Sequence, residues 1–441
     1  MSSENLRSSF GRITRPSTLK SRQTILTLKG GKTVKKTQQE KEKRSALSSL
    51  RLTMIESSIT AGLLCISIMT PFFQSIGLNQ QEIAITQIIF TIVVSVLNVP
   101  TGWLADRFSR KWANIIGDFG TFIVFIAYAN VQNIVGAIIC ESLLGILIAF
   151  SQGVDVSLIR HFCYKIVTRK SENKRINEDA EKFFKSKVAR LSTAQYACEL
   201  ILLLLGGPIG AISFRLAIAL SGVTALIGGI ISIFIKDDSE KLQTEGKPVK
   251  EMLRITKGAM KNKPLRNRIF AFAVGRQLTH GIIWVATPIF LFAGVPLPIV
   301  SVAWAINSVT CIVGSIVATR YTNRLSERWL FAIPLILALI SMGALSISIN
   351  LFTACLYFLM GIVQGWTNAT LMPMVQRHAD PAEQTTIVSI AKVAGQILYI
   401  PIVWLTGYAA DISLNYAPLV TLIIFIPLGL LVIKTLNKQT P

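Results

Sequence analysis

Seven ionisable side chains lie inside long apolar stretches of the 441-residue chain, and their signs differ between its two halves. The acids of the first half are Glu56, Asp118, Glu141 and Glu199. The bases of the second half are Arg276, His280 and Lys392. A charge near the centre of a lipid bilayer costs roughly 2.5–3.5 kcal/mol on insertion scales, so it normally faces a cavity or a partner. The opposite signs therefore predict that the two halves meet across a central cavity.

Glu141 and Glu199 are the strongest candidates for proton exchange, because each lies near the middle of its apolar stretch. A carboxyl group in a medium of low dielectric constant holds its proton more tightly than in water, so it can exchange protons near neutral pH. Arg276 and His280 are four residues apart and so share one face of a helix. We expect one of them to compete with the proton as the partner of Glu141. The alternative is a static salt bridge that only holds the halves in register.

Aromatic and amide side chains in the second half predict a pocket for a small, partly apolar solute. Trp284 follows His280 in one apolar stretch. The remaining candidates of this kind are Gln364, Trp366 and Asn368, which alternate along another stretch. Because tryptophan is also common where a helix leaves the bilayer, an interfacial role for the two tryptophans is the alternative.

The stretches that carry these groups are long enough to be membrane-spanning helices. Hydrophobic residues make up 51% of the chain and charged residues only 15%, whereas about 25% of the residues in a soluble domain are charged. A helix that crosses a bilayer needs about 20 mainly apolar residues, and about twelve segments meet this requirement. The predicted spans are 53–76, 83–105, 112–130, 133–156, 191–211, 213–235, 269–292, 297–319, 329–348, 350–374, 385–408 and 413–434. This composition excludes an intrinsically disordered protein and a disulfide-linked scaffold.

The positive charges lie almost entirely on one side of the predicted spans. The formal net charge is +22, and 42 of the 45 lysines and arginines fall in the terminal segments and in alternate loops. Cytoplasmic loops of membrane proteins carry such an excess. We therefore expect both termini in the cytoplasm, an even number of spans and a location in the cell membrane (inner or plasma). Since the charge then marks orientation, we expect no nucleic-acid partner.

The loops divide the chain into four segments. Residues 1–52 are basic and poor in apolar side chains, which predicts a disordered cytoplasmic arm. A targeting peptide and an arm that contacts anionic lipid headgroups are the alternatives. Two bundles of six helices are expected at 53–235 and 269–441, joined by a cytoplasmic linker at 236–268. The predicted fold class is an all-α integral membrane protein.

No pattern in the sequence indicates a bound metal, a nucleotide or an enzyme site. The six cysteines lack the spacing of metal ligands or of a disulfide framework. The loop histidines, His161 and His378, are far apart in the chain. A Gly-rich nucleotide-binding loop with its lysine is also lacking. We expect no cofactor, no metal and no enzymatic activity, and an energy source other than ATP.

A polar turn pattern occurs twice in the chain, first between the second and third predicted spans. Its first copy begins at Gly102 and has the pattern Gly-x-x-x-Asp-Arg-x-x-Arg-Lys. The charged residues of this copy are Asp106, Arg107, Arg110 and Lys111. A weaker copy, from Ser315 to Arg324, lies 213 residues later and lacks the acid. Two related halves of six spans each are typical of transporters built from parallel repeats.

This turn resembles the signature motif of the major facilitator superfamily, and the resemblance covers about residues 52–435. It implies a secondary active transporter in which two six-helix bundles rock, so that a central site opens to each side of the membrane in turn. It also implies that Asp106, Arg107 and Arg110, within the motif from Gly102 to Lys111, stabilise the outward-facing state.

The resemblance also indicates which spans line the central transport cavity. In this family spans one, four, seven and ten line it, which favours Glu141 and the pair Arg276 and His280. Glu141 stands in span four, where drug antiporters of the family often carry an arginine. The stretch 206–211 is similar to a motif of proton-coupled antiporters, although small residues also serve for helix packing alone. The stretch 151–159 is similar to a pattern of a prokaryotic branch with few assigned substrates.

We expect a secondary transporter that exports a small amphipathic compound in exchange for protons and that works as a monomer in the bilayer. Uptake of an anionic metabolite is the alternative within transport, because Arg276, His280 and Lys392 would attract an anion. A membrane scaffold that does not transport and acts through the basic arm is the alternative outside transport.

Overall fold

The computed structural model describes residues 40–151, 153–167, 174–236, 248–322, 324–380 and 383–437. At 98–108, 174–177, 248–252, 385 and 437 it describes the backbone alone. Throughout these residues the regular structure is helical, and none of them forms a strand. Most of the predicted arm, residues 1–39, lies outside the described residues.

Eight helices belong to the described part of the first half. They are a helix at 40–60, α2 (Met69–Ser75), α3 (Gln80–Phe108), α4 (Arg110–Tyr128), α5 (Ile134–Ser151), α6 (Val154–Val167), α7 (Lys174–Ile212) and α8 (Phe214–Phe234). The described helices of the second half are α9 (Pro248–Lys261), α10 (Lys263–His280), α11 (Ile283–Phe292), α12 (Leu297–Tyr321), α13 (Glu327–Ile347), α14 (Leu351–Leu356), α15 (Phe358–Arg377), α16 (Gln384–Ile412) and α17 (Tyr416–Asn437).

Helices occupy all the predicted spans, and nine stretches of the described chain are both long and apolar enough to cross a membrane. The other three predicted spans do not form one sufficiently long and apolar helix, and each has a local reason. Span one is divided between the helix at 40–60 and α2, and span ten between α14 and α15. Span three, α4, carries the charged side chains of Arg110, Lys111 and Asp118. The prediction of an all-α integral membrane protein is confirmed.

Spans one, seven and ten are not the continuous helices that we predicted. Span one unwinds at residues 61–68, span seven is interrupted between α10 and α11, and span ten between α14 and α15. A break leaves backbone groups without helical partners, and side chains take their place. Ser221 Oγ accepts a hydrogen bond from the Cys65 N–H at 3.0 Å, and Thr406 Oγ1 donates to the Gly281 carbonyl oxygen at 3.0 Å.

Residues 40–52 are helical in the structure, whereas we predicted an unstructured arm up to residue 52. Ala46 and Leu50 of this segment are four residues apart and buried. They pack with Leu158 and Phe162 of α6 in a small apolar cluster. This packing extends the helix beyond the part that the hydropathy pattern identifies.

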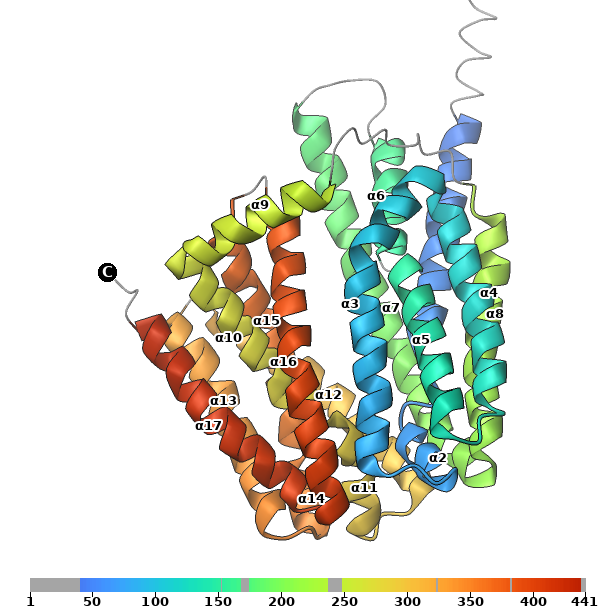
Figure 1. Cartoon of the computed structure of the whole chain (residues 1–441). Coiled ribbons are helices and arrows are strands. Elements are labelled where there is room, and N and C mark those ends of the chain that lie inside the picture. The colour runs from blue at the N-terminus through green and yellow to red at the C-terminus, as the bar shows by residue number, and fades with distance from the viewer. Residues whose placement is uncertain are drawn as a thin grey trace, which may run out of the picture.

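Each half has its own apolar core, and the halves meet along a seam in which α3 packs against α16 and α7 against α12. Figure 1 shows the two halves close together near α2 and α11 and farther apart toward α6 and α9. We call the side with α2 and α11 the closed end. The other side, where α6 and α9 carry several lysines and arginines, is called the basic end.

Hydroxyl groups join the two halves near the closed end. Ser67 Oγ and Ser301 Oγ lie 3.0 Å apart. Thr70 Oγ1 donates to the Trp284 carbonyl oxygen at 3.0 Å, and Thr287 Oγ1 donates to the Ser67 carbonyl oxygen at 3.0 Å. Each such bond contributes only about 0.5–1.5 kcal/mol. The seam can therefore part without the loss of either apolar core.

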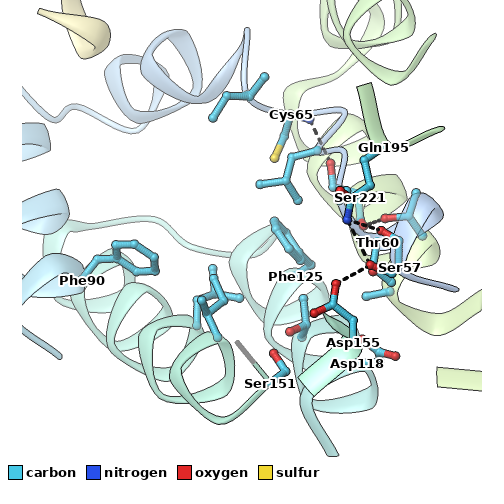
Figure 2. Close-up of a pocket in the computed structure, with 18 of the residues that line it drawn as sticks. Ser57, Thr60, Cys65, Phe90, Asp118, Phe125, Ser151, Asp155, Gln195 and Ser221 are labelled. Atoms are coloured by element: carbon cyan, nitrogen blue, oxygen red, sulfur yellow. Dashed lines mark hydrogen bonds between the residues drawn. The ribbon is translucent and has the colours of Figure 1, made fainter. Parts of the chain in front are cut away.

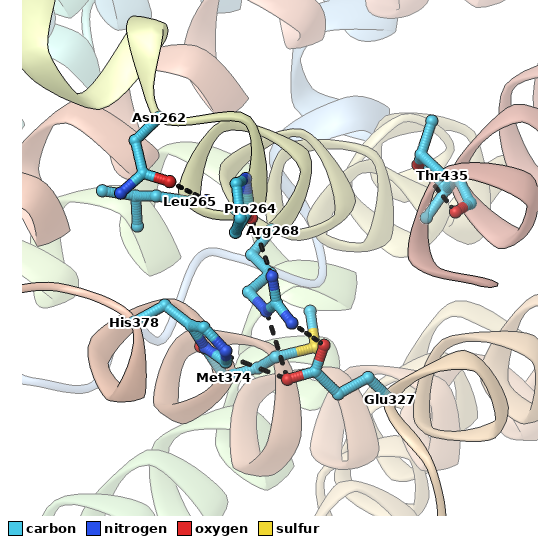
Figure 3. A network of polar contacts seen from close by, with 9 residues as sticks. Asn262, Pro264, Leu265, Arg268, Glu327, Met374, His378 and Thr435 are labelled. Carbon is cyan, nitrogen blue, oxygen red and sulfur yellow. Dashed lines mark hydrogen bonds and ion pairs between the residues drawn. The ribbon is translucent and has the colours of Figure 1, made fainter. Parts of the chain in front are cut away.

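A buried ion pair ties α10 to α13 within the second half (Figure 3). Arg268 Nη2 lies 2.7 Å from Glu327 Oε2, and Arg268 Nε donates to Glu327 Oε1 at 3.2 Å. The Arg268 side chain is only 7% exposed and that of Glu327 29%. His378 at the end of α15 approaches the same carboxylate, with 3.9 Å between Nδ1 and Oε1. The loop assigned to 236–268 therefore ends in a residue that belongs to the bundle.

We predict that Glu327→Gln lowers the thermal unfolding midpoint of the purified protein in detergent, because it leaves the buried Arg268 guanidinium without its counter-charge. Removal of one partner from a buried pair costs about 3–5 kcal/mol. The control is Glu383→Gln, which breaks the more exposed Arg254–Glu383 pair (3.3 Å); an exposed pair contributes about 0–1 kcal/mol. Equal midpoints for the two variants would contradict the structural role of Arg268.

Candidate functional site

A cavity of about 500 Å³ lies inside the first half, and the lining residues come from the helix at 40–60, from α3 to α8 and from Trp284 of α11. Small-molecule sites typically measure about 300–1,000 Å³. Four carboxylic acids line the cavity: Glu56, Asp118, Glu141 and Asp155. No lysine, arginine or histidine occurs among its described lining residues. Figure 2 shows Asp118 and Asp155 on the same side of this cavity as Ser57.

The rest of the wall combines neutral polar groups with aromatic rings. Its amides and hydroxyl groups belong to Ser57, Thr60, Gln87, Asn114, Thr121, Ser151, Gln195, Ser221 and Thr224. Its rings are Phe90, Phe125 and Trp284. Such a wall offers hydrogen-bond donors and acceptors beside flat apolar surfaces, as small-molecule sites commonly do.

Glu141 is buried at 5% exposure and is held by two neutral donors. Gln87 Nε2 donates to Glu141 Oε1 at 2.7 Å, and Tyr128 Oη donates to the same oxygen at 2.8 Å. α5 presents Glu141 to the bundle because it shares a buried helical face with Ala137 and Leu144. Among the described residues no ion pair involves Glu141. Its partners are therefore compatible with either a charged or a protonated carboxyl group.

Glu56 and Asp118 form a second acidic group on the same cavity. Their carboxyl groups lie close enough to interact with each other. Asn114 Nδ2 donates to Glu56 Oε2 at 3.4 Å, and Ser232 Oγ donates to Asp118 Oδ2 at 3.4 Å. We ranked these acids below the midspan pair in the sequence because each lies near a basic loop. The structure places both on the cavity, and Glu56 is 4% exposed.

Asp155 was not among our candidates, because it lies at the cytoplasmic end of the fourth predicted span. In the structure Ser57 Oγ donates to Asp155 Oδ2 at 2.6 Å, and Gln195 Nε2 donates to Ser57 Oγ at 3.0 Å (Figure 2). This chain of contacts joins the first helix, α6 and α7 beside the cavity. Within the described part of the chain no three histidine, cysteine or acidic side chains are placed to hold a metal ion.

Glu199 and His280 share a second cavity, of about 230 Å³, between the halves. Gln364 of α15 also lines it. His280 Nδ1 lies 3.0 Å from the Arg276 carbonyl oxygen, so one of the two ring nitrogens of His280 has a hydrogen-bond partner. Across the described residues no ion pair links Glu141 or Glu199 to a base of the second half, so the expected acid–base pair between the halves is absent from this structure.

The other predicted cavity residues of the second half divide into two groups. Trp284 lines the larger cavity and donates from Nε1 to Tyr399 Oη at 2.9 Å. Trp366 instead packs in a small cluster at 5% exposure and donates to the Leu330 carbonyl oxygen. It lies on the opposite side of α15 from Gln364, since two residues turn a helix by about 200°. Trp366 therefore does not line either of the two described cavities, and its role in solute binding stays a prediction.

Asn368, Arg276 and Lys392 do not line either of these two cavities. The side chains of Asn368 and Lys392 are exposed. Arg276 is partly buried, and its Cδ lies close to Gly395 of α16. Their roles in solute binding stay predictions.

The motif between α3 and α4 is only partly described. The side chains of Gly102, Asp106 and Arg107 lie outside the described residues, although the helical backbone of α3 continues through them. Arg110 begins α4. Lys111 Nζ donates to the Ile233 carbonyl oxygen of α8 at 2.6 Å. The role of the motif in the outward-facing state stays a prediction.

Gln87 and Tyr128, the two hydrogen-bond donors to Glu141, were also missed by the sequence analysis. Each occurs singly in an apolar stretch, and Gln87 is 54 residues from Glu141. No local spacing links either residue to Glu141, because the contacts arise only when α3, α4 and α5 pack together. The one available signal was the polar amide of Gln87 inside a predicted span.

We predict that Tyr128→Phe and Glu141→Gln are coupled in a double-mutant cycle of unfolding free energy measured in mixed micelles. Residues in direct hydrogen-bonded contact show interaction energies of about 0.5–3 kcal/mol. The ring contacts of Tyr128 with Phe73 and Phe125 survive the change to Phe. Tyr357→Phe is the control, because this buried tyrosine belongs to the core of the other half. Additivity in both cycles would contradict the Tyr128–Glu141 contact.

Comparisons with known proteins agree with this architecture. The family model described as Major Facilitator Superfamily matches residues 52–403. A point mutant of the nucleoside transporter NupG superimposes with a TM-score of 0.72 at 12% identity, covering 90% of this chain and 100% of that one. A bacterial homologue of the human lysosomal transporter Spinster, in an inward-facing and unoccupied conformation, gives 0.67 at 12% identity, covering 90% and 97%. No curated protein matches the chain.

At such low identity the solved structures show a shared fold alone, whereas the family model covers most of the chain. The family works by alternating access of a bound solute to the two sides of a membrane. This chain belongs to the major facilitator superfamily and is a multi-pass secondary transporter.

Proposed function

We propose that this transporter binds a neutral or positively charged, partly apolar solute in the cavity of the first half and exports it in exchange for protons. The observation that carries the proposal is the cavity wall itself, which has four carboxylic acids and no basic side chain among its described residues. The volume of about 500 Å³ suits a small molecule.

The charge of the wall selects against anions. The four acids around this cavity repel a negatively charged solute when they are ionised, and no described lining residue supplies a positive charge to attract one. The bases that favoured uptake of an anionic metabolite, Arg276 and Lys392, do not line this cavity. The rings of Phe90, Phe125 and Trp284 favour a solute with a flat apolar part. An amphipathic cation or a neutral ring compound satisfies both features.

Glu141 is the group that we assign to proton exchange. Gln87 and Tyr128 hold its carboxyl group in place without neutralising a charge. If a cation binds only when this carboxyl group has released its proton, solute and proton exclude each other from the cavity. Mutual exclusion couples their movements in opposite directions, which is export driven by an inward proton gradient.

The proposed cycle follows from the arrangement of the halves. The basic end is assigned to the cytoplasm by the excess of positive charge, and the membrane is then the inner or plasma membrane. The halves meet at the closed end and diverge toward the basic end (Figure 1), so this conformation corresponds to access from the cytoplasm. The turn from Gly102 to Lys111 would meet its partners when the halves rock and the basic end closes.

The test uses proteoliposomes that contain the purified transporter and a trapped pH indicator. Solutes of three classes are added outside at equal pH: permanently charged amphipathic cations, nucleosides and dicarboxylates. Antiport of protons makes the lumen more alkaline as the solute enters, whereas symport acidifies it. We expect alkalinisation with cations or neutral ring compounds and none with dicarboxylates. Proton movement with dicarboxylates alone, or solute entry without proton movement, would overturn the proposal.

We predict that Glu141→Gln abolishes solute-driven proton movement, because an amide cannot exchange a proton under these conditions. The matched control is Glu178→Gln, which makes the same chemical change at an exposed position of α7 outside the cavity. This control should retain the wild-type rate. Proton movement that persists in Glu141→Gln would remove Glu141 from the mechanism.

A further inference from the structure

The carboxylate of Asp411, near the end of α16 in the second half, reaches the first turn of α3 in the first half. Asp411 Oδ1 accepts a hydrogen bond from the Gln80 N–H at 2.7 Å, and Asp411 Oδ2 accepts one from the Gln81 N–H at 2.9 Å. The first N–H groups of a helix have no partner within the helix, and the helix dipole makes this end attractive to a negative charge. Asp411 therefore caps a helix that belongs to the other bundle.

α3 also has a cap of its own, and the two caps serve different groups. Asn79 Oδ1 accepts from the Glu82 N–H at 2.8 Å, and Glu82 Oε2 accepts from the Asn79 N–H at 3.0 Å. This capping box leaves the N–H groups of Gln80 and Gln81 free. The carboxylate of Asp411 accepts hydrogen bonds from both of these N–H groups. The start of α3 is therefore fully bonded within the protein only while the two halves are together at this end.

The approach of α16 to α3 also depends on Gly407, one turn before Asp411. A methyl group on Gly407 would lie 2.8 Å from the Gln80 carbonyl oxygen and 2.8 Å from Ala84 Cβ, closer than packed atoms tolerate. Residues four apart share one helix face. The same face of α16 therefore combines a missing side chain, which lets the backbones approach, with a carboxylate that bonds to the exposed amides.

We propose that Asp411 is a positioning residue of the transport cycle: it holds the end of the transporter near α2 and α11 closed by capping α3 across the seam. The bond is reversible because the Asp411 side chain is partly open to solvent. When this end opens, water replaces Asp411 on the amides of Gln80 and Gln81 and hydrates the carboxylate. This role concerns alternating access alone and does not depend on the solute or on proton coupling.

The test measures the distance between the halves at this end by double electron–electron resonance. Spin labels are attached at Gln74→Cys in α2 and Ile347→Cys in α13, both exposed in the structure, in a background without the native cysteines. We predict that Asp411→Asn lowers the ratio of the short-distance to the long-distance population about tenfold, as expected for the loss of charge-assisted hydrogen bonds. Asp411→Glu keeps the charge and should restore most of the short-distance population.

The matched control is Glu82→Gln, which removes a carboxylate charge from the first turn of the same helix, where it interacts with the helix dipole, away from the seam. Its distance distribution should equal that of the parent protein. If Glu82→Gln opens this end as much as Asp411→Asn does, the effect is only a weaker α3 and the proposal is wrong. An Asp411→Asn protein with the parent distribution and an unchanged melting midpoint also overturns it.

Discussion

The cost of keeping carboxylic acids inside a membrane protein without neighbouring cations is the constraint on which this structure depends. An unpaired charge in a medium of low dielectric constant is unfavourable unless hydrogen bonds or water stabilise it. The first half meets this requirement around a cavity, where Gln87 and Tyr128 donate to Glu141, Asn114 donates to Glu56 and Ser232 donates to Asp118. The second half stabilises its buried charge in another way, because the guanidinium of Arg268 is paired with the carboxylate of Glu327. The two bundles therefore share an architecture and differ in their chemistry.

The seam between the bundles suits a structure that must open and close. Its described bonds join hydroxyl groups, a side-chain amide and the Asp411 carboxylate to one another or to backbone groups, such as Thr70 to Trp284 and Gln80 to Asp411. Water can replace each of them singly when the halves separate, so no large free-energy barrier arises from any one contact. The apolar cores, by contrast, lie within each half. Rocking of the bundles changes the seam and leaves the cores intact.

Composition and hydropathy were enough to predict the fold, because a bilayer permits few architectures for long apolar segments. The turn from Gly102 to Lys111 indicated the protein family, and the family model confirms this prediction over residues 52–403. The breaks in spans one, seven and ten were not predictable from hydropathy, since the broken segments remain apolar. The contacts that stabilise these breaks, such as Ser221 with Cys65, come from helices far away in the sequence.

The site was predictable in part, and the reason lies in what a sequence pattern encodes. Glu141 and Trp284 were expected on a central cavity between the halves, whereas the cavity that they line in the structure lies inside the first half. Trp366 lies away from both described cavities because the helical face that α15 turns to them depends on packing with α12 and α13. Asp155 was left out and Asp411 was not considered, because each lies near the end of a helix, where an acid is common and carries little information.

The most direct test of the central claim is infrared difference spectroscopy of the purified, membrane-reconstituted protein at acidic and alkaline pH. If Glu141 exchanges protons in the cavity, the difference spectrum should contain a protonated-carboxyl band that is weaker in Glu141→Gln and unchanged in Glu178→Gln. No substrate is needed for this measurement. A carboxyl band identical in the wild type and in Glu141→Gln would contradict the assignment of Glu141 as the proton-exchanging group.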